Sequence, residues 1–202
     1  MTSKSKGFST RAVHAGEKRD PYTGAVITPI YETSVFGFSS TKELIDIMSE
    51  KAEGYIYTRY GNPTVRTVER KMAELEGAED AAVFSSGMAA IATTMLTLTS
   101  SGDHVVSTRD LYGGTLALFK DVLPKFGVEV SFVEATDFEE IKSAVQMNTK
   151  IIFAETPTNP TLKVVDVSKV AELGKKNGIT VVVDSTFASP YNLQPLRFCV
   201  DI

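Results

Sequence analysis

Residues 151–186 read IIFAETPTNPTLKVVDVSKVAELGKKNGITVVVDST, and this stretch decides the fold class. Two short apolar runs, Ile151–Ala154 and Ile179–Val183, are typical of strands that are buried on both faces. Between them, Val167–Lys176 has the apolar spacing of a helix, with Asp166 as its cap and a glycine after its end. A strand, a helix and a second strand in this order predict two parallel strands joined by a crossover helix.

The same alternation of strands and helices extends upstream of this stretch. We expect further strands at Ala81–Phe84, His104–Ser107 and Val128–Val133. We expect helices at Gly87–Leu98, Gly114–Phe126 and Phe138–Val145, and one before them from about residue 64 to Leu75. The sequence therefore predicts a three-layer α/β/α fold with a mostly parallel sheet and with ligands bound beyond the carboxyl ends of the strands.

The first part of the chain has a different character. Residues 1–55 are irregular and rich in Gly, Pro, Ser and Thr, and they contain one expected helix. Ser40 or Thr41 would cap this helix, and apolar residues recur at helical spacing after it. We therefore divide the chain into an N-terminal arm, residues 1–60, and an α/β domain, residues 61–202.

Composition and charge exclude several classes of protein. The chain is 43% apolar and 23% charged with a net charge of −4, and it has no basic stripe, which argues against a nucleic-acid partner. Cys199 is the only cysteine, and His14 and His104 have no Cys or His neighbours, so we expect no internal disulfide and no zinc site. Neither a signal peptide nor a run of about 20 apolar residues is present, so we expect a cytoplasmic protein without a membrane partner.

Two of the expected strands are followed by motifs that suit a flat, phosphorylated ligand. Ser86-Gly87-Met88 begins a helix directly after a strand, where free backbone N–H groups and the helix dipole favour a phosphate. Tyr112 precedes a glycine pair after the next strand, and its ring could stack on a flat ligand. Taken alone, these motifs favour ordinary roles, a capped helix and a core or rim tyrosine. The glycine fingerprints of dinucleotide folds and P-loops are missing, which disfavours a nucleotide-binding oxidoreductase.

Three further motifs place polar side chains where a ligand could use them. Asn159 lies between two prolines that make its loop rigid, and either X-Pro bond there could be cis. Asp184 follows an apolar strand, where a carboxylate needs a cationic or donating partner. Tyr57 and Arg59 point the same way along an extended chain and together suit a phosphate. Taken alone, these residues favour a turn, a cap and a solvated surface arginine.

The order of these motifs is far more specific than any one of them. It resembles the Cys/Met-metabolism (transsulfuration) family of enzymes that depend on pyridoxal 5'-phosphate (PLP). The motifs are, in chain order, Pro29-Ile30-Tyr31-x-Thr33-Ser34, Tyr57-x-Arg59-x-Gly61-Asn62-Pro63, Ser86-Gly87-Met88, Tyr112-Gly113-Gly114-Thr115, Glu155-Thr156-Pro157-x-Asn159-Pro160 and Asp184-Ser185-Thr186. The resemblance runs from about Phe8 to the end and implies an incomplete large domain of the type I, aspartate aminotransferase-like PLP fold.

The resemblance also implies roles for residues at the helix start and in two loops. Gly87 and Met88, with Ser86 before them, would bind the PLP phosphate through backbone N–H groups. Tyr112 would stack on the pyridine ring and is also a candidate acid/base group. Asn159 would bond the phenolic oxygen of PLP.

Further implied roles concern the ring nitrogen and a second subunit. Asp184 would pair with the pyridinium nitrogen, and Thr186 would lie near the cofactor. Tyr57 and Arg59 would reach the phosphate of a neighbouring subunit's PLP. The resemblance therefore implies a homo-oligomer, a dimer of dimers, whose active sites are shared between subunits and to which the N-terminal arm contributes contacts.

The Schiff-base lysine of the family is not found in this chain. It belongs to a Ser-x-[ST]-Lys segment, which we expect a few residues beyond Ile202. Lys150 precedes a strand and Lys163 lies in a loop, so neither matches. The chain therefore resembles the N-terminal portion of an enzyme, and a non-catalytic scaffold subunit without the lysine is the alternative of another class.

The resemblance implies elimination or replacement at the γ (or β) carbon of sulfur amino acids. We expect a protein like cystathionine γ-synthase or cystathionine γ-lyase, with methionine γ-lyase and O-acylhomoserine sulfhydrylase as alternatives. Ala117 stands where many cystathionine-handling members carry arginine, and Gly114 stands where methionine γ-lyases commonly carry cysteine. These two positions leave the reaction branch open.

Overall fold

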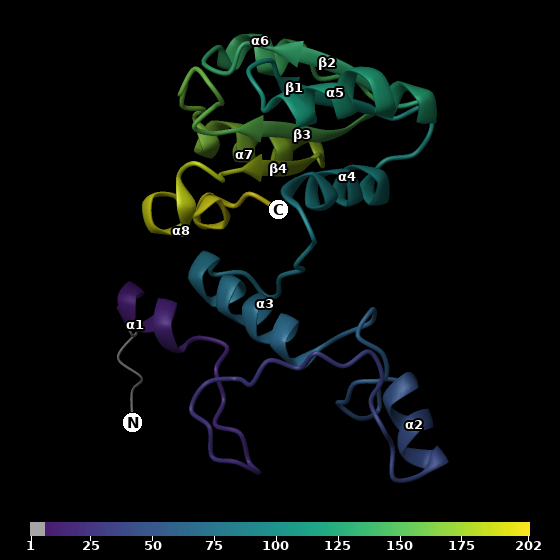
Figure 1. The fold of residues 1–202 in the computed structure, drawn as a ribbon. Coiled ribbons are helices and arrows are strands. Elements are labelled where there is room, and N and C mark those ends of the chain that lie inside the picture. The colour runs from purple at the N-terminus through teal and green to yellow at the C-terminus, as the bar shows by residue number, and fades with distance from the viewer. Residues whose placement is uncertain (1–6) are drawn as a thin grey trace. The chain divides into compact units, whose positions relative to one another are not determined.

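The computed structural model describes residues 7–202 and contains two compact units (Figure 1). One unit extends to Val83, and the other consists of residues 84–202. Residues 1–6 of the expected arm lie outside the described residues. Within the described part of the chain, no helix is both long and apolar enough to cross a membrane.

The described part of the first unit holds three helices, each followed or preceded by irregular chain. They are α1 (Phe8–His14), α2 (Thr41–Met48) and α3 (Pro63–Glu76). Ser40 caps α2, as one of the two expected residues, by accepting the Glu43 N–H at 3.2 Å. Helix α1 was not expected, because a helix of 7 residues leaves little periodicity to detect.

Helix α3 anchors the extended chain that precedes it. Asn62 caps the helix by accepting the Thr64 N–H at 2.9 Å, and its amide group donates to the Tyr31 carbonyl at 2.9 Å. The Thr64 hydroxyl donates to the Pro29 carbonyl and accepts from the Tyr31 N–H. Gly77 ends the helix at φ 76°, a left-handed conformation that favours glycine.

The second unit is built on a parallel sheet, as the sequence predicts. Its strands are β1 (His104–Thr108), β2 (Glu129–Val133), β3 (Thr149–Glu155) and β4 (Thr180–Asp184), in the spatial order β2-β1-β3-β4. Its main helices are α4 (Gly87–Leu98), α5 (Gly113–Ala117), α6 (Phe138–Ser143) and α7 (Val167–Asn177). A short helix α8 (Ser189–Asn192) and a 3₁₀ turn (Pro195–Phe198) follow β4.

Apolar side chains cover both faces of this sheet, which makes the fold three-layered. Neighbouring residues along each strand point to opposite faces, so Val105 and Val106 enter different cores. The core with Val106 includes Val170 of α7 and Ile141 of α6. The core with Val105 includes Met95 of α4. The continuous apolar runs in the sequence follow from this burial on both sides.

Two expected elements differ from those in the structure. Ala81–Phe84 forms no strand: the residues make no sheet hydrogen bonds, and Val83 and Phe84 are 42% and 38% exposed. An apolar run predicts burial, but a strand also needs a neighbouring strand. The helix expected at Gly114–Phe126 is divided into α5, a π-helical turn at Leu118–Val122 and a 3₁₀ turn at Leu123–Phe126. Pro124 lies in that last turn and cannot donate a helix hydrogen bond.

Candidate cofactor site

A hollow of about 390 Å³ lies at the carboxyl edge of the sheet in the second unit. The chain segments that follow β1, β3 and β4 line it together with the start of α4. Seven of the nine predicted cofactor residues line this hollow: Ser86, Gly87, Met88, Tyr112, Asn159, Asp184 and Thr186. The structure therefore brings together side chains that are far apart in the sequence, at the edge where parallel sheets bind ligands.

The start of α4 provides an open pair of backbone donors. The Ser86 hydroxyl caps the helix by accepting the Ala89 N–H at 3.1 Å. Among the described residues, no acceptor takes the N–H groups of Gly87 and Met88. A Cβ atom at Gly87 would meet nothing within 4 Å, so the approach to these groups is free. This arrangement suits a phosphate.

Tyr112 supplies an aromatic ring to the hollow and is 51% exposed. Gly114 lets this ring lie close to the start of α5. A Cβ atom at position 114 would lie 2.7 Å from Cε1 of Tyr112 and 3.0 Å from Sδ of Met88. Glycine at this position is therefore required for the observed packing of the tyrosine ring.

Asn159 lies in a loop with two cis peptide bonds, Thr156-Pro157 and Asn159-Pro160. Thr158 is buried in the same loop, and its hydroxyl accepts the Lys163 N–H at 2.9 Å. The side-chain amide of Asn159 makes no hydrogen bond to any described residue. It is therefore free to donate to an oxygen of a ligand.

Asp184 ends β4 with one carboxylate oxygen engaged and one open. Its Oδ1 accepts the backbone N–H of Thr186 at 3.0 Å and also the Thr186 hydroxyl. Its Oδ2 takes no hydrogen bond from the described residues. Thr186 thus orients the acid, and the open oxygen can accept an N–H from a cationic ring.

Glu155 also lines the hollow, although sequence reasoning did not assign it a site role. It is only 5% exposed and lies opposite Asp184 in the register of β3 and β4. Burial raises the pKa of its carboxyl group. The signal that could have identified it is the acidic residue at the end of an otherwise apolar strand. Ile91, Pro157 and Phe187 line the hollow too and were not predicted.

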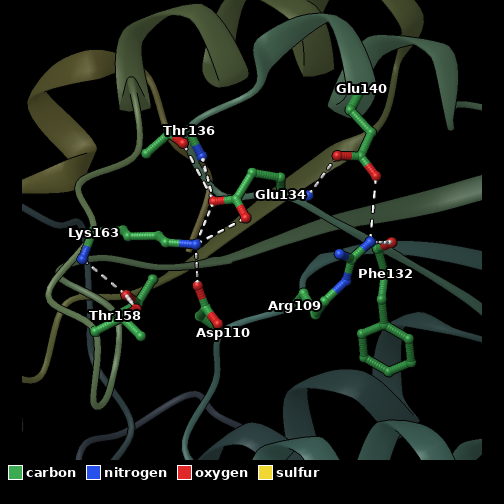
Figure 2. A network of polar contacts seen from close by, with 9 residues as sticks. Arg109, Asp110, Phe132, Glu134, Thr136, Glu140, Thr158 and Lys163 are labelled. Atoms are coloured by element: carbon green, nitrogen blue, oxygen red, sulfur yellow. Dashed lines mark hydrogen bonds and ion pairs between the residues drawn. The ribbon is translucent and has the colours of Figure 1, made fainter.

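A charged network ties together the loops beside the hollow (Figure 2). The Lys163 ammonium group contacts Asp110 at 2.7 Å and Glu134 at 2.8 Å, and it lowers the pKa of both carboxyl groups. The two carboxylates in turn raise the pKa of Lys163. Lys163 thus joins the loop after β3 to the chain segments that follow β1 and β2.

Tyr57 and Arg59 belong to the first unit. The Arg59 guanidinium lies over the rings of Tyr57 and Tyr60, with 4.9 Å and 5.2 Å to the ring centroids. Tyr57 also forms an isolated antiparallel bridge with Val35. The contact of Tyr57 and Arg59 with a phosphate of another subunit stays a prediction.

The donors and acceptors of the hollow fit PLP group by group. Free N–H groups at a helix start suit the phosphate, an exposed tyrosine suits the ring, an amide suits the phenolic oxygen, and a half-open carboxylate suits the ring nitrogen. In the described part of the chain, no group of three or more His, Cys, Asp or Glu residues could hold a metal ion.

A family model described as Cys/Met metabolism PLP-dependent enzyme matches residues 9–202. The chain belongs to this family. An L-methionine gamma-lyase of Fusobacterium nucleatum is 45% identical over 203 residues, which cover 100% of this chain and 51% of that protein. A cystathionine gamma-lyase of Bacillus subtilis is 43% identical over 96% of this chain and 48% of its own length.

The solved structures of the family agree with the fold. A Campylobacter jejuni protein, solved with N'-pyridoxyl-lysine-5'-monophosphate in its chain, has a TM-score of 0.92 at 31% identity. The match covers 97% of this chain and 48% of that one. The resemblance expected from the ordered motifs is confirmed, and the chain spans about half the length of these relatives.

Proposed function

We propose that the complete protein is a PLP-dependent enzyme that eliminates or replaces the γ (or β) substituent of sulfur amino acids. The observation that carries this proposal is the hollow itself. Within a chain of this family, it gathers seven predicted cofactor residues at the carboxyl edge of the sheet. The names of the relatives, which include a methionine γ-lyase and a cystathionine γ-lyase, support a substrate from methionine and cysteine metabolism.

In this proposal each side of the hollow binds one part of the cofactor. The N–H groups of Gly87 and Met88 hold the phosphate, Tyr112 stacks on the ring, and Asn159 donates to the phenolic oxygen. Asp184 keeps the ring nitrogen protonated through its open oxygen, with Thr186 fixing the orientation of the carboxylate. A protonated PLP ring withdraws electrons from the bound amino acid, which makes its Cα proton easier to remove.

The proposal includes a cytoplasmic homo-oligomer, a dimer of dimers, with sites shared between subunits. Tyr57 and Arg59 would bind the phosphate of the neighbouring subunit's PLP, as the family resemblance implies. The Arg59 guanidinium lies over the rings of Tyr57 and Tyr60, and a planar guanidinium can still bind an anion through its N–H groups. The lysine that binds PLP covalently would come from a part of the protein outside residues 1–202.

Gly114 and Ala117 bear on the reaction branch. A cysteine at position 114 would place its Cβ against Tyr112 and Met88, so the tyrosine ring would have to move. Ala117 offers no charge for a distal carboxylate. We therefore propose a substrate with an uncharged or activated side chain, such as an O-acylhomoserine. Methionine and cystathionine are the substrates with which it should be compared.

The test is turnover by the complete protein loaded with PLP. Cystathionine, methionine and an O-acylhomoserine with a thiol are offered in turn, and release of a 2-keto acid or formation of a thioether is measured. We expect turnover of at least one substrate. Binding of PLP without turnover of any of them would favour the scaffold alternative and overturn the proposed activity.

A further inference from the structure

Both carboxylate oxygens of Glu155 are engaged by backbone N–H groups from two different loops. Its Oε2 accepts the Tyr112 N–H at 2.8 Å, and its Oε1 accepts the Asn159 N–H at 2.7 Å. Tyr112 and Asn159 both line the hollow, one after β1 and the other after β3. The Glu155 side chain therefore connects the loop that carries the Tyr112 ring to the loop that carries the Asn159 side-chain amide.

We propose that Glu155 is the positioning residue of the hollow, and that its carboxylate sets the placement of Tyr112 relative to Asn159. The proposal rests on the proposed function, because it assigns Glu155 a task in holding PLP. Glu155 itself touches neither the ring nor the phosphate in this assignment. It acts through the two backbone amides that it binds.

The chemistry of the site requires a carboxylate rather than any side chain of the same size. Each of the two amides needs an acceptor, and ionised Glu155 offers one oxygen to each. A glutamine has one acceptor oxygen only, so its NH₂ group would face one of the two N–H groups. An aspartate keeps the charge but is shorter by one methylene, so it could not reach both amides.

Burying the carboxylate of Glu155 costs desolvation free energy. The residue is 5% exposed, and no lysine, arginine or histidine of the described chain forms an ion pair with it. Two backbone hydrogen bonds offset part of the desolvation of this carboxylate, whose pKa is still raised by burial. This cost is accompanied by one structural effect, which is that Glu155 joins the two loops that hold Tyr112 and Asn159.

The backbone of Glu155 is itself fixed at the edge of the sheet. Its N–H donates to the Thr108 hydroxyl at 3.3 Å, and Glu155 pairs in register with Asp184. The next residue, Thr156, donates its N–H to the Asp184 carbonyl at 2.9 Å. Glu155, which positions Tyr112 and Asn159, is thus held next to the end of β4, which positions Asp184.

The test combines hydrogen exchange with cofactor binding in the complete protein. Glu155→Gln and Glu155→Asp are compared with the wild type, and Glu139→Gln is the matched control. Glu139 is also a glutamate of the second unit, but its side chain is 76% exposed and pairs only with Lys142. Amide exchange is followed by mass spectrometry in peptides covering residues 110–116 and 157–163, and PLP affinity is measured by titration.

We expect exchange about tenfold faster in at least one of the two peptides in both Glu155 variants, and PLP affinity weaker by about tenfold, from the loss of one buried hydrogen bond. Protection of residues 104–108 in β1 should stay unchanged, which would show that the sheet is intact. Glu139→Gln should behave as the wild type in each measurement.

Four results would decide against the proposal or separate it from the proposed function. Unchanged exchange in both peptides of Glu155→Gln would overturn it, and so would full recovery of protection and affinity by Glu155→Asp. Should β1 lose protection in both variants, Glu155 would be a general stability residue and the positioning role would fall. Absence of PLP binding by the wild type would overturn the proposed function, while the exchange data would still decide the role of Glu155.

Discussion

At the scale of single residues, Asp184 is the carboxylate that would bind the ring nitrogen in the proposed cofactor site. In Asp184→Asn the shape is kept and the hydrogen bonds from Thr186 can still form, but the negative charge is lost. We expect PLP affinity to fall by about tenfold or more, because a charge-assisted bond contributes roughly 1.5–3 kcal/mol. A PLP titration of the complete protein checks this, and unchanged affinity would remove Asp184 from the site.

His104 gives a residue-scale prediction that does not depend on the cofactor. It is 1% exposed, and its ring nitrogens hydrogen-bond Thr149 at 2.8 Å and Ser131 at 2.9 Å. Burial lowers its pKa from the ordinary value of 6.5. The unfolded chain therefore takes up a proton at a higher pH than the folded chain does, so the free energy of unfolding falls as the pH drops below about 6.5.

The variant His104→Gln should have a lower free energy of unfolding than the wild type at pH 8. Between pH 8 and pH 5 its free energy of unfolding should fall less than that of the wild type, because position 104 no longer takes up a proton. Urea unfolding at the two pH values measures the slope. His14→Gln is the control, because it also replaces a histidine, but an exposed one outside the sheet. Equal slopes in His104→Gln and the wild type would refute the assignment of the decline to His104.

At the scale of elements, the start of α4 combines a structural cap with the proposed phosphate site. Ser86→Ala removes the bond to the Ala89 N–H and should lower the free energy of unfolding by about 1 kcal/mol. Ser86→Asp restores a cap but adds a negative charge beside the expected phosphate. We expect near-normal stability and clearly weaker PLP binding in Ser86→Asp. Normal PLP affinity in that variant would mean that the phosphate lies elsewhere.

The elements also mark how far sequence reasoning reaches. Gly87–Leu98 was predicted with the bounds that the structure has, because a Ser cap and the apolar helix that follows it are local signals. Ala81–Phe84 was wrong as a strand, because pairing depends on a neighbour that no local pattern reveals. The role of Glu155 was missed for a similar reason. Its partner Asn159 is 4 residues away in the sequence, but its other partner, Tyr112, is 43 residues away, and no local pattern reveals that contact.

At the scale of the whole molecule, the proposed sharing of sites between subunits has a direct consequence. Arg59→Ala and Asp184→Asn should each leave little activity in a pure homo-oligomer. If Arg59 serves the neighbouring subunit's site, mixed oligomers of the two variants contain some sites with both residues intact. Activity should therefore rise on mixing, and the rise should require subunit exchange. No rise in mixtures that demonstrably exchange subunits would place Arg59 and Asp184 in the same subunit's site, or Arg59 in none.

The most direct test of the central claim is a crystal structure of the complete protein grown with PLP. We predict the phosphate at the N–H groups of Gly87 and Met88, the ring against Tyr112, and the ring nitrogen within hydrogen-bond distance of Asp184. Cofactor bound away from this hollow, or a hollow that stays empty at saturating PLP, would contradict it.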